Sequence, residues 1–401
     1  MKKNWQTKKL GEVCEIITGG TPKTSVKDFY GNEFLWAGPS DLDQGVFITN
    51  TNKKLSKKGF RESGIRLIPK NSVLLSCIGN IGKIGIAIEE MATNQQINTF
   101  VPNLKILDSK YLYYVLIIKT EEFKLASSQT TLPIINKTRC SNIEIPLPSL
   151  LKQKEIVKYL DNKFAKLREV KQLQELALVD TEKILSQNLH EIFEDGKKKG
   201  WKEKTIGDIT EVVTKGTTPK TFGESFTDSG VPFLKAENIT GGPVDLEKLM
   251  TFISHKTNDL LNRSKTKSGD VLMTIAGTIG RVGYLIDNSP EMNTNQAVAI
   301  IRPQKNIISS AFLTYALQSP FIQKGIWSGV VKAAIPNFSL TRIKEIFMPI
   351  PPLSEQKQII KKLDTLVEKL QTLKELQKQQ LEDFKKLEKA YLLEAFNGEL
   401  V

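Results

Sequence analysis

The chain has 401 residues, of which 40% are hydrophobic and 25% charged, and its net charge is +13 at pH 7. At roughly 150 residues per domain this length predicts two or three domains and excludes a single small domain stabilised by disulfides. The composition excludes a fully disordered chain and a membrane protein. The longest apolar run, residues 112–118, is too short to cross a bilayer, and no apolar segment follows the basic N-terminus, so we expect a cytoplasmic protein.

The second half of the sequence repeats the first. WQTKKLGEVCEIITGGTPKT from Trp5 matches WKEKTIGDITEVVTKGTTPKT from Trp201, and VLLSCIGNIGKIG from Val73 matches VLMTIAGTIGRVG from Val271. Further on, TNQ at 93–95 matches TNQ at 294–296, and PLP at 146–148 matches PIP at 349–351. The offset between matching residues grows only from 196 to 203, so the chain contains two copies of one plan.

Each copy begins with about 145 residues whose sequence pattern predicts a mixed α/β structure. Short apolar or alternating runs at 72–77 and 296–301 predict strands, and Gly and Pro residues punctuate the loops between such runs. Aromatic and aliphatic residues recur at three and four over 109–118 and 310–318, which predicts short helices there. GxIGxxG recurs in both copies without the Ser or Thr that a phosphate loop requires after its lysine, so it indicates tight turns between strands.

Each copy ends in a long amphipathic helix of about 40 residues, or roughly 60 Å. Apolar residues recur at the spacing of a coiled-coil seam at Leu160, Phe164, Leu167 and Val170, and again at Leu363, Leu366, Leu370 and Leu373. Ser149 and Ser354 are the predicted N-caps, and Asp195-Gly196 and Asn397-Gly398 the predicted stops.

The two long helices are expected to pack against each other, because neither would leave its apolar stripe exposed. A pseudo-twofold between the copies makes the pair antiparallel and places the globules at opposite ends. The predicted fold is therefore α/β (α+β), with two similar mixed α/β globules joined by two antiparallel coiled-coil helices. The predicted segments are globules at 1–148 and 197–351 and long helices at 149–196 and 352–401.

No residue pattern indicates catalysis or a cofactor. The histidines, His190 and His255, form no metal-binding motif, and His255 is expected in a solvated loop. Cys14, Cys77 and Cys140 lack metal-ligand spacing and are expected to be reduced thiols. An enzyme is therefore not expected, and no metal ion is.

The positive charge lies in the two globules, with a net +7 over residues 1–150 and +4 over 201–350, which suggests a polyanionic partner. The candidate phosphate contacts lie in predicted loops, although a solvated surface would explain any single lysine. They are Lys23, Lys27, Lys53, Lys54, Lys57, Lys58, Arg61 and Arg66 in copy one, and Lys220, Lys235, Lys256, Arg263, Lys265, Lys267 and Lys332 in copy two.

If the two globules read different DNA sequences, residues that match between copies are scaffold or backbone contacts, and base readers lie where the copies diverge. The candidate base readers fall in such a diverging region, which holds the donor and acceptor types that major-groove edges need: Trp36, Ser40, Asp41, Asp43 and Gln44 in copy one, and Lys235, Glu237 and Asn238 in copy two. A buried Trp36 or surface carboxylates would explain these residues equally well.

Taken together, these motifs resemble those of the DNA specificity subunits of type I restriction-modification enzymes, over essentially the whole chain. The resemblance rests on GGTPK at 19–23, GTTPK at 216–220, the VLxxxxGxIGxxG segments, the two TNQ motifs, and PIPPLSEQKQII at 349–360. Copy one departs from the last motif: it reads PLPSLLKQKEIV, with Lys152 in place of Glu355.

The resemblance implies two target-recognition domains, each reading half of a split target in double-stranded DNA, with the helices as a spacer. It also implies partners: two methyltransferase (modification) subunits docked along the helices, and restriction subunits that join that core. The methyl donor, ATP and magnesium would then belong to the partners. Candidate partner contacts in the helix-opening motifs are Gln153, Glu355 and Gln356.

Two other functions remain open from the sequence. A coiled-coil adaptor between proteins would show no steep salt dependence of DNA affinity, whereas several phosphate contacts require one. A sequence-independent DNA binder would show the salt dependence without a preferred site.

Overall fold

The structure, a computed structural model, describes residues 5–127, 133–328 and 337–397. The chain divides into two compact units. Unit 1 comprises Met1–Gln174 together with Gln379–Val401, and unit 2 comprises Glu175–Lys378. Each unit therefore holds one globule and a segment of each long helix. The segment boundaries predicted from the sequence divide the chain differently and stay a prediction.

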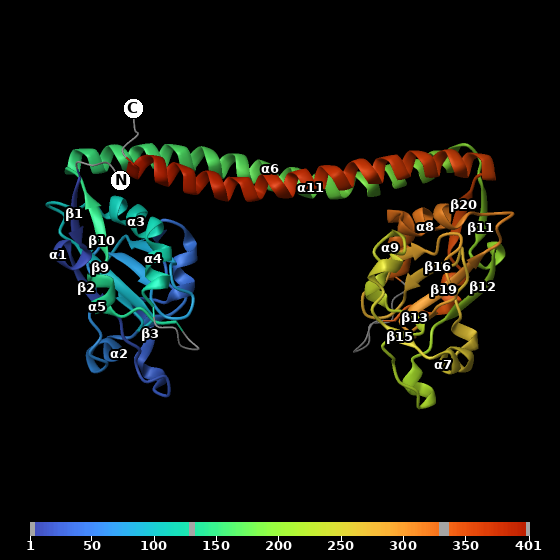
Figure 1. Cartoon of the computed structure of the whole chain (residues 1–401), viewed down its shortest axis with the longest axis horizontal. Coiled ribbons are helices and arrows are strands. Elements are labelled where there is room, and N and C mark those ends of the chain that lie inside the picture. The colour runs from blue at the N-terminus through green and yellow to red at the C-terminus, as the bar shows by residue number, and fades with distance from the viewer. Residues whose placement is uncertain (1–4, 128–132, 329–336, 398–401) are drawn as a thin grey trace. The chain divides into compact units, whose positions relative to one another are not determined.

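Unit 1 contains a five-stranded sheet of order β2-β9-β6-β7-β4, a three-stranded sheet β5-β3-β8 and a ribbon β1-β10 (Figure 1). The parallel pairs are β3 with β8 and β4 with β7. The strands are β1 Gln6–Lys9, β2 Cys14–Thr18, β3 Tyr30–Ala37, β4 Phe47–Ile48, β5 Lys54–Leu55, β6 Val73–Ser76, β7 Ile84–Ala87, β8 Ala92–Thr93, β9 Ile97–Pro102 and β10 Glu144–Leu147.

Unit 2 repeats this topology strand for strand, with sheets β12-β19-β16-β17-β14 and β15-β13-β18 and a ribbon β11-β20. Its strands are β11 Lys202–Thr205, β12 Thr210–Lys215, β13 Val231–Leu234, β14 Gly242–Pro243, β15 Phe252–Ile253, β16 Val271–Thr274, β17 Val282–Tyr284, β18 Asn293–Thr294, β19 Val298–Pro303 and β20 Phe347–Ile350. The duplication predicted from the sequence is confirmed as a duplication of the fold.

The five-stranded sheets form because their central strands are apolar on both faces. Every residue of β6 and of β16 is buried. Alternate side chains point to opposite faces, so Val73 and Leu75 enter one core while Leu74 enters another, as Leu272 does in unit 2. Such continuous apolar runs are typical of strands buried on both sides.

The short helices predicted at 109–118 and 310–318 are present as α3 Ser109–Ile118 and α8 Ser310–Gln318. His255 is exposed, as expected, but it begins a helix and does not lie in a loop.

The remaining short helices are α1 Leu10–Val13, α2 Lys57–Glu62, α4 Thr120–Leu125, α5 Lys137–Ser141, α7 His255–Leu260, α9 Pro320–Ser328 and α10 Leu340–Lys344. The 3-10 turns are η1 Lys27–Phe29, η2 Pro39–Gln44, η3 Gly207–Ile209, η4 Pro219–Phe222, η5 Ala236–Asn238, η6 Leu246–Lys248 and η7 Asn262–Ser264. None of the described helices is both long and apolar enough to cross a membrane.

The long helices are longer than predicted: α6 is Leu150–Lys198, with 49 residues, and α11 is Leu353–Asn397, with 45. Ser149 precedes α6 as predicted, and its hydroxyl accepts the Lys152 N–H. Ser354 is not the N-cap of α11, because the Pro352 carbonyl already accepts the N–H of Gln356 and the helix begins at Leu353, two residues earlier than an N-cap at Ser354 would give. Gly398 lies outside the described residues.

The predicted stop at Asp195-Gly196 is also wrong. The helix continues through Gly196 because Trp201 packs on it: a Cβ there would lie 2.2 Å from the indole ring. Termination comes at Gly200, whose φ of +76° favours glycine. The Trp201 N–H then bonds to the Gly196 carbonyl and the Gly200 N–H to the Lys197 carbonyl, which is a Schellman ending.

Within each unit, the segments of α6 and α11 run antiparallel and complete the core of the globule. In unit 1 the Gln174 amide bonds to Gln380 at 2.5 Å, and in unit 2 the Gln377 amide bonds to Thr181 at 3.1 Å. Phe396 packs 5.4 Å from the Tyr111 ring of α3 in unit 1. The equivalent contact in unit 2 is Phe193 on Phe312 of α8, at 5.8 Å.

Two buried glutamines fasten each globule to the start of the long helix that follows it. Gln153 is fully buried, accepts the Asp108 N–H at 2.8 Å and donates to the carbonyls of Ile106 and Pro148. Gln356 repeats all three bonds with Ser309, Ile307 and Pro351. Gln153 and Gln356 are therefore not available as partner contacts, and their recurrence in both copies has a structural cause.

Replacing one of these glutamines is expected to destabilise only its own unit. Gln153→Leu leaves the Asp108 N–H and two carbonyls buried without partners, which costs on the order of 1–3 kcal/mol per group. Hydrogen–deuterium exchange should show faster exchange in α3 and β10 while unit 2 is unchanged. Gln356→Leu should give the reverse pattern.

The matched control is Gln371→Leu, at an exposed position of α11. It should leave exchange unaltered in both units. Equal exchange in Gln153→Leu and in the control would contradict the fastening role.

Candidate nucleic-acid interface

The motifs shared by the two copies meet at one edge of each five-stranded sheet. In unit 1, β2 and β6 end where β9 begins, because both pair with β9 in antiparallel register: Thr18 lies opposite Asn98 and Ser76 opposite Ile97. GGTPK follows β2, the GxIGxxG turn follows β6, and TNQ precedes β9. We call this the motif edge, and the register of β12, β16 and β19 creates the same edge in unit 2.

Direct contacts join the motifs. The Gly20 N–H donates to the Thr93 carbonyl at 2.9 Å, and the Thr217 N–H donates to the Thr294 carbonyl at the same distance. A Cβ on Gly19 would lie 2.2 Å from the Asn94 carbonyl oxygen, so this close approach requires glycine. The shared motifs therefore form the scaffold of the edge, as the comparison of the copies predicted for TNQ.

The opposite edge of each sheet faces the long helices of its own unit. In unit 1, Ser109 at the start of α3 bonds to the Asn71 carbonyl just before β6, and Gln153 of α6 binds the adjacent loop. Figure 1 shows α3 between the sheet and the long helices. The Tyr114 hydroxyl of α3 donates to Asp161 of α6 at 2.6 Å, and Tyr315 to Asp364 at 2.7 Å in unit 2. The motif edge is thus the side of the globule that the helices do not cover.

Five candidate cations of copy one lie in this uncovered region without acidic partners, whereas Lys58 pairs with Asp28 at 3.5 Å and Arg66 pairs with Glu15 at 3.2 Å. Lys53 and Lys54 line a groove of about 490 Å³ together with Tyr30, Asn32 and Asn52. Lys23 follows GGTPK, Lys27 begins η1 and Lys57 begins α2, and all three are exposed. Among the described residues, none of these five lysines forms an ion pair. Lys53 and Lys54 therefore share one groove, and the other three carry unpaired charge at exposed positions of unit 1.

Two candidates of copy two, Lys256 and Lys265, form close ion pairs. Lys256 pairs with Glu224 at 2.9 Å and lowers the pKa of that carboxyl. Lys265 bonds to Asp259 at 2.7 Å and pairs also with Glu291, and these contacts raise the pKa of Lys265.

The other copy-two candidates divide into three groups. Lys235 lies over the Phe226 ring, 5.5 Å from its centroid, and 4.0 Å from Glu237. Lys220 is exposed, and Arg263 donates to Thr217 of GTTPK at 3.3 Å, so these two extend the motif edge. Lys332 lies outside the described residues.

Of the candidate base readers, four are exposed: Ser40, Asp43, Gln44 and Glu237. Trp36 is 7% exposed, and its indole N–H donates to the Gly20 carbonyl at 3.0 Å. Its side chain therefore fixes the backbone of the GGTPK segment from the core side. Asn238 is half-buried, and its side-chain oxygen accepts the Lys235 N–H, as Asp41 accepts the Gly38 N–H in copy one. Trp36 is therefore a core residue, and Asn238 shapes its own turn.

Sequence reasoning missed one basic residue at this edge. Arg281 lies in the GxIGxxG turn of copy two, is exposed, and borders a groove with Thr240, Gly241, Gln318 and Gln323. The signal was present in the sequence, because the equivalent position in copy one, Lys83, is also basic.

The described residues contain no group of three or more His, Cys, Asp or Glu placed to hold a metal ion. The three cysteines are free and buried, and burial raises the pKa of Cys14 and Cys77 to about 12, so these thiols stay protonated at neutral pH.

Glu355, the third candidate partner contact, is already engaged within unit 2. Its carboxylate accepts the Trp201 indole N–H at 3.2 Å and lies 3.6 Å from the Lys199 ammonium. At the equivalent place in copy one, Lys152 bonds to Glu155 instead. The two copies therefore do not share this contact.

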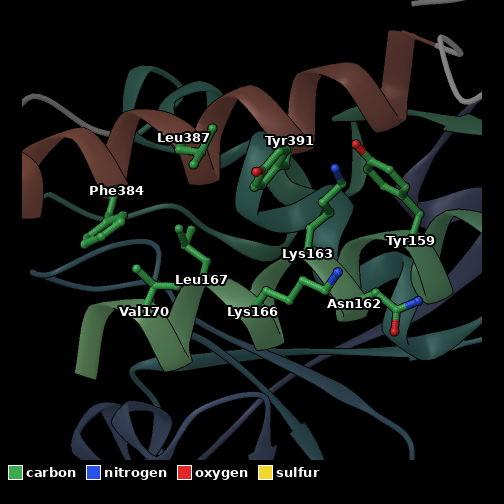
Figure 2. A pocket seen from close by; sticks show the side chains of 9 residues that line it. All are labelled: Tyr159, Asn162, Lys163, Lys166, Leu167, Val170, Phe384, Leu387 and Tyr391. Atoms are coloured by element: carbon green, nitrogen blue, oxygen red, sulfur yellow. The ribbon is translucent and has the colours of Figure 1, made fainter. Parts of the chain in front are cut away.

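A second candidate for a partner surface is an open groove on the helix segments of unit 1, shown in Figure 2. It has a volume of about 480 Å³ and is lined by Tyr159, Asn162, Lys163, Lys166, Leu167, Val170, Phe384, Leu387 and Tyr391. The Lys163 ammonium lies 4.9 Å from the centroid of Tyr391 and 5.3 Å from that of Tyr159. Val170 is 48% exposed and Leu387 37%, so apolar surface and positive charge adjoin here.

Comparison with known proteins places both copies in one family. The family model of the type I restriction modification DNA specificity domain matches residues 2–178 and 198–383. The chain belongs to this family.

Relatives named as specificity subunits match over the whole chain or part of it. The type I restriction enzyme MjaIX specificity subunit of Methanocaldococcus jannaschii is 26% identical over 428 aligned residues, covering 99% of this chain and 94% of the relative. The HindI specificity subunit of Haemophilus influenzae is 33% identical over 181 residues, covering 43% of this chain and 39% of the relative.

Two solved structures share the fold. A chain from structural work on complex assembly and conformational transition of the type I R-M system has a TM-score of 0.79 at 20% identity, with 100% of this chain and 99% of that chain covered. The HsdS subunit from Thermoanaerobacter tengcongensis has a TM-score of 0.60 at 21% identity, with 99% and 98% covered. At these identities the likeness concerns the fold of the specificity family.

Removing two unpaired cations from the copy-one groove is expected to flatten the salt dependence of DNA binding. Lys53→Gln with Lys54→Gln should reduce the slope of log K against log salt by about 1.8, since each lost phosphate contact contributes about 0.9. Fluorescence anisotropy on a labelled duplex at several salt concentrations measures this slope.

The charge-matched control is Lys9→Gln with Lys105→Gln, two exposed lysines near the opposite edge of the same globule. The control should leave the slope unchanged. The same loss in both pairs would indicate that only net charge matters.

Proposed function

We propose that this chain is the DNA-specificity subunit of a type I restriction-modification complex. Each globule reads one half of a bipartite target in double-stranded DNA through its motif edge, and the long helices set the gap between the halves. One observation supports this most strongly: a single scaffold is built twice in one chain, and the loops beside its shared motifs differ in charge and shape.

The chemistry of the complex resides in other subunits, and the chain itself contributes recognition. Two methyltransferase subunits bind along the helices, and restriction subunits join them, in the cytoplasm. The methyl donor, ATP and magnesium are used by those subunits. This assignment agrees with the family, whose members here are named specificity subunits.

The groove of Figure 2 is the part of the helices that best suits a docked subunit in unit 1. It combines exposed apolar side chains with two lysines, which suits an apolar segment that carries acidic residues. The glutamines of the helix-opening motifs are buried, so they support the helices and do not meet a partner.

The proposed function is tested by binding selection from random duplex DNA, with the chain copurified with its methyltransferase. The expected result is two short blocks of fixed sequence separated by an unread gap of constant length. Binding that depends on salt but enriches no sequence would indicate a DNA tether. No DNA binding would indicate a protein adaptor.

Placing a negative charge in the groove is expected to remove one methyltransferase subunit. Val170→Glu lies beside Lys166 at an exposed position, so the fold should be retained while an acidic partner segment is repelled. Native mass spectrometry of the copurified complex should show one methyltransferase subunit per chain where the unsubstituted chain holds two.

Met250→Glu, at a site that is 83% exposed in unit 2 and outside the helices, is the control and should keep both subunits. Full occupancy in Val170→Glu would exclude the groove as the docking surface.

A further inference from the structure

The GxIGxxG turn presents one basic residue in each copy. Lys83 follows Gly82 and precedes β7, and Arg281 follows Gly280 and precedes β17. Both turns lie at the motif edge, because each connects the end of a central strand to the next strand of the same sheet. The two positions are equivalent in the fold, so their surroundings can be compared directly.

In copy one the charge is cancelled within the protein. The Lys83 ammonium bonds to the Asp43 carboxylate at 2.5 Å, and the Lys83 side chain is 28% exposed. A phosphate approaching Lys83 would therefore meet an ion pair in which the carboxylate, 59% exposed, repels it.

In copy two, Thr240 occupies the place of Asp43. The correspondence follows from the preceding turn, where Asp41 accepts the Gly38 N–H and Asn238 accepts the Lys235 N–H, both at an offset of 197 residues. Two residues further on, the same offset matches Asp43 with Thr240. Thr240 indeed borders the same groove as Arg281.

Arg281 is therefore an uncompensated cation on a fixed turn. Among the described residues, no ion pair or hydrogen bond of its guanidinium is found, and the side chain is exposed. Two glutamine side chains fix the conformation of this turn. The Gln323 amide donates to the carbonyls of Gly280 and Leu317, and the Gln318 amide donates to the carbonyl of Val282. Gly280 has a φ of +89°, and a Cβ there would lie 2.6 Å from the Gln323 side-chain oxygen.

We propose that Arg281 binds a backbone phosphate of the half-site read by the second globule, and that Asp43 cancels the equivalent contact of Lys83 in the first. A planar guanidinium suits this ligand, since its parallel N–H groups can bond two phosphate oxygens at once. The amide side chains and Thr240 around it form a polar groove that admits the phosphate. The proposal rests on the proposed function and adds to it a contact that differs between the half-sites.

The test uses the full chain with its methyltransferase subunits and a fluorescent duplex that carries the selected target. Arg281→Gln should weaken binding severalfold at 100 mM salt and reduce the slope of log K against log salt by about 0.9. Arg281→Lys should keep most of the slope. Removing both charges of the copy-one pair, with Lys83→Gln and Asp43→Asn together, should leave both quantities unchanged, because the pair carries no net charge.

The gain-of-contact variant is Asp43→Thr, which gives copy one the residue that copy two has. It should steepen the slope by about 0.9, and adding Lys83→Gln should reverse this gain. Thermal melting of each variant checks that the fold is retained.

An unchanged slope in both Arg281→Gln and Asp43→Thr would overturn the assignment while the proposed function stands. A changed half-site sequence in Arg281→Gln would also overturn it, because Arg281 would then read a base edge. If the unsubstituted complex selects no target and does not bind DNA, the proposed function itself fails.

Discussion

Each globule depends on an aromatic side chain that reaches its core from far along the chain. Phe396 of α11 packs on Tyr111 in unit 1, and Phe193 of α6 packs on Phe312 in unit 2. Full burial of such a side chain contributes roughly 1.5–3 kcal/mol, and both are at most 5% exposed. The C-terminal end of α11 completes the core of the first globule, and the C-terminal end of α6 completes the core of the second. Both long helices are therefore part of the globule cores. The globules and the helix segments fold as one structure within each unit.

This dependence assigns different tasks to the two edges of each sheet. The edge that faces the helices repeats its contacts in both copies: a buried glutamine, a Tyr–Asp hydrogen bond and a serine at the start of α3 or α8. At the motif edge only the backbone scaffold repeats, and the charges differ. Five candidate lysines of copy one have no ion pair among the described residues, whereas Lys256 and Lys265 of copy two lie beside carboxylates. The copies thus share a backbone scaffold at the motif edge and differ there in which cations are paired.

The helix-opening motifs show how a shared pattern can mislead. PLPSLLKQ and PIPPLSEQ are alike because Gln153 and Gln356 must reach the same three backbone groups, and a buried backbone group without a partner is costly. Glu355 differs from Lys152 because only unit 2 places an indole N–H and a lysine beside it. The accessible groove of Figure 2 is lined instead by residues that no motif contains.

The sequence alone determined the duplication, the two long helices and the exact bounds of α3 and α8, because hydrophobic period and repeated motifs are local properties of the chain. It also located the segments that form the motif edge, although not the fact that they meet. Only the tertiary structure decided the state of each candidate residue: Trp36 is buried beneath GGTPK, Lys256 and Lys265 are neutralised, and Arg281 is exposed. The reason is physical. Whether a charge is free depends on the acids that folding brings within a few ångströms, and Asp43 lies 40 residues from Lys83 in the chain.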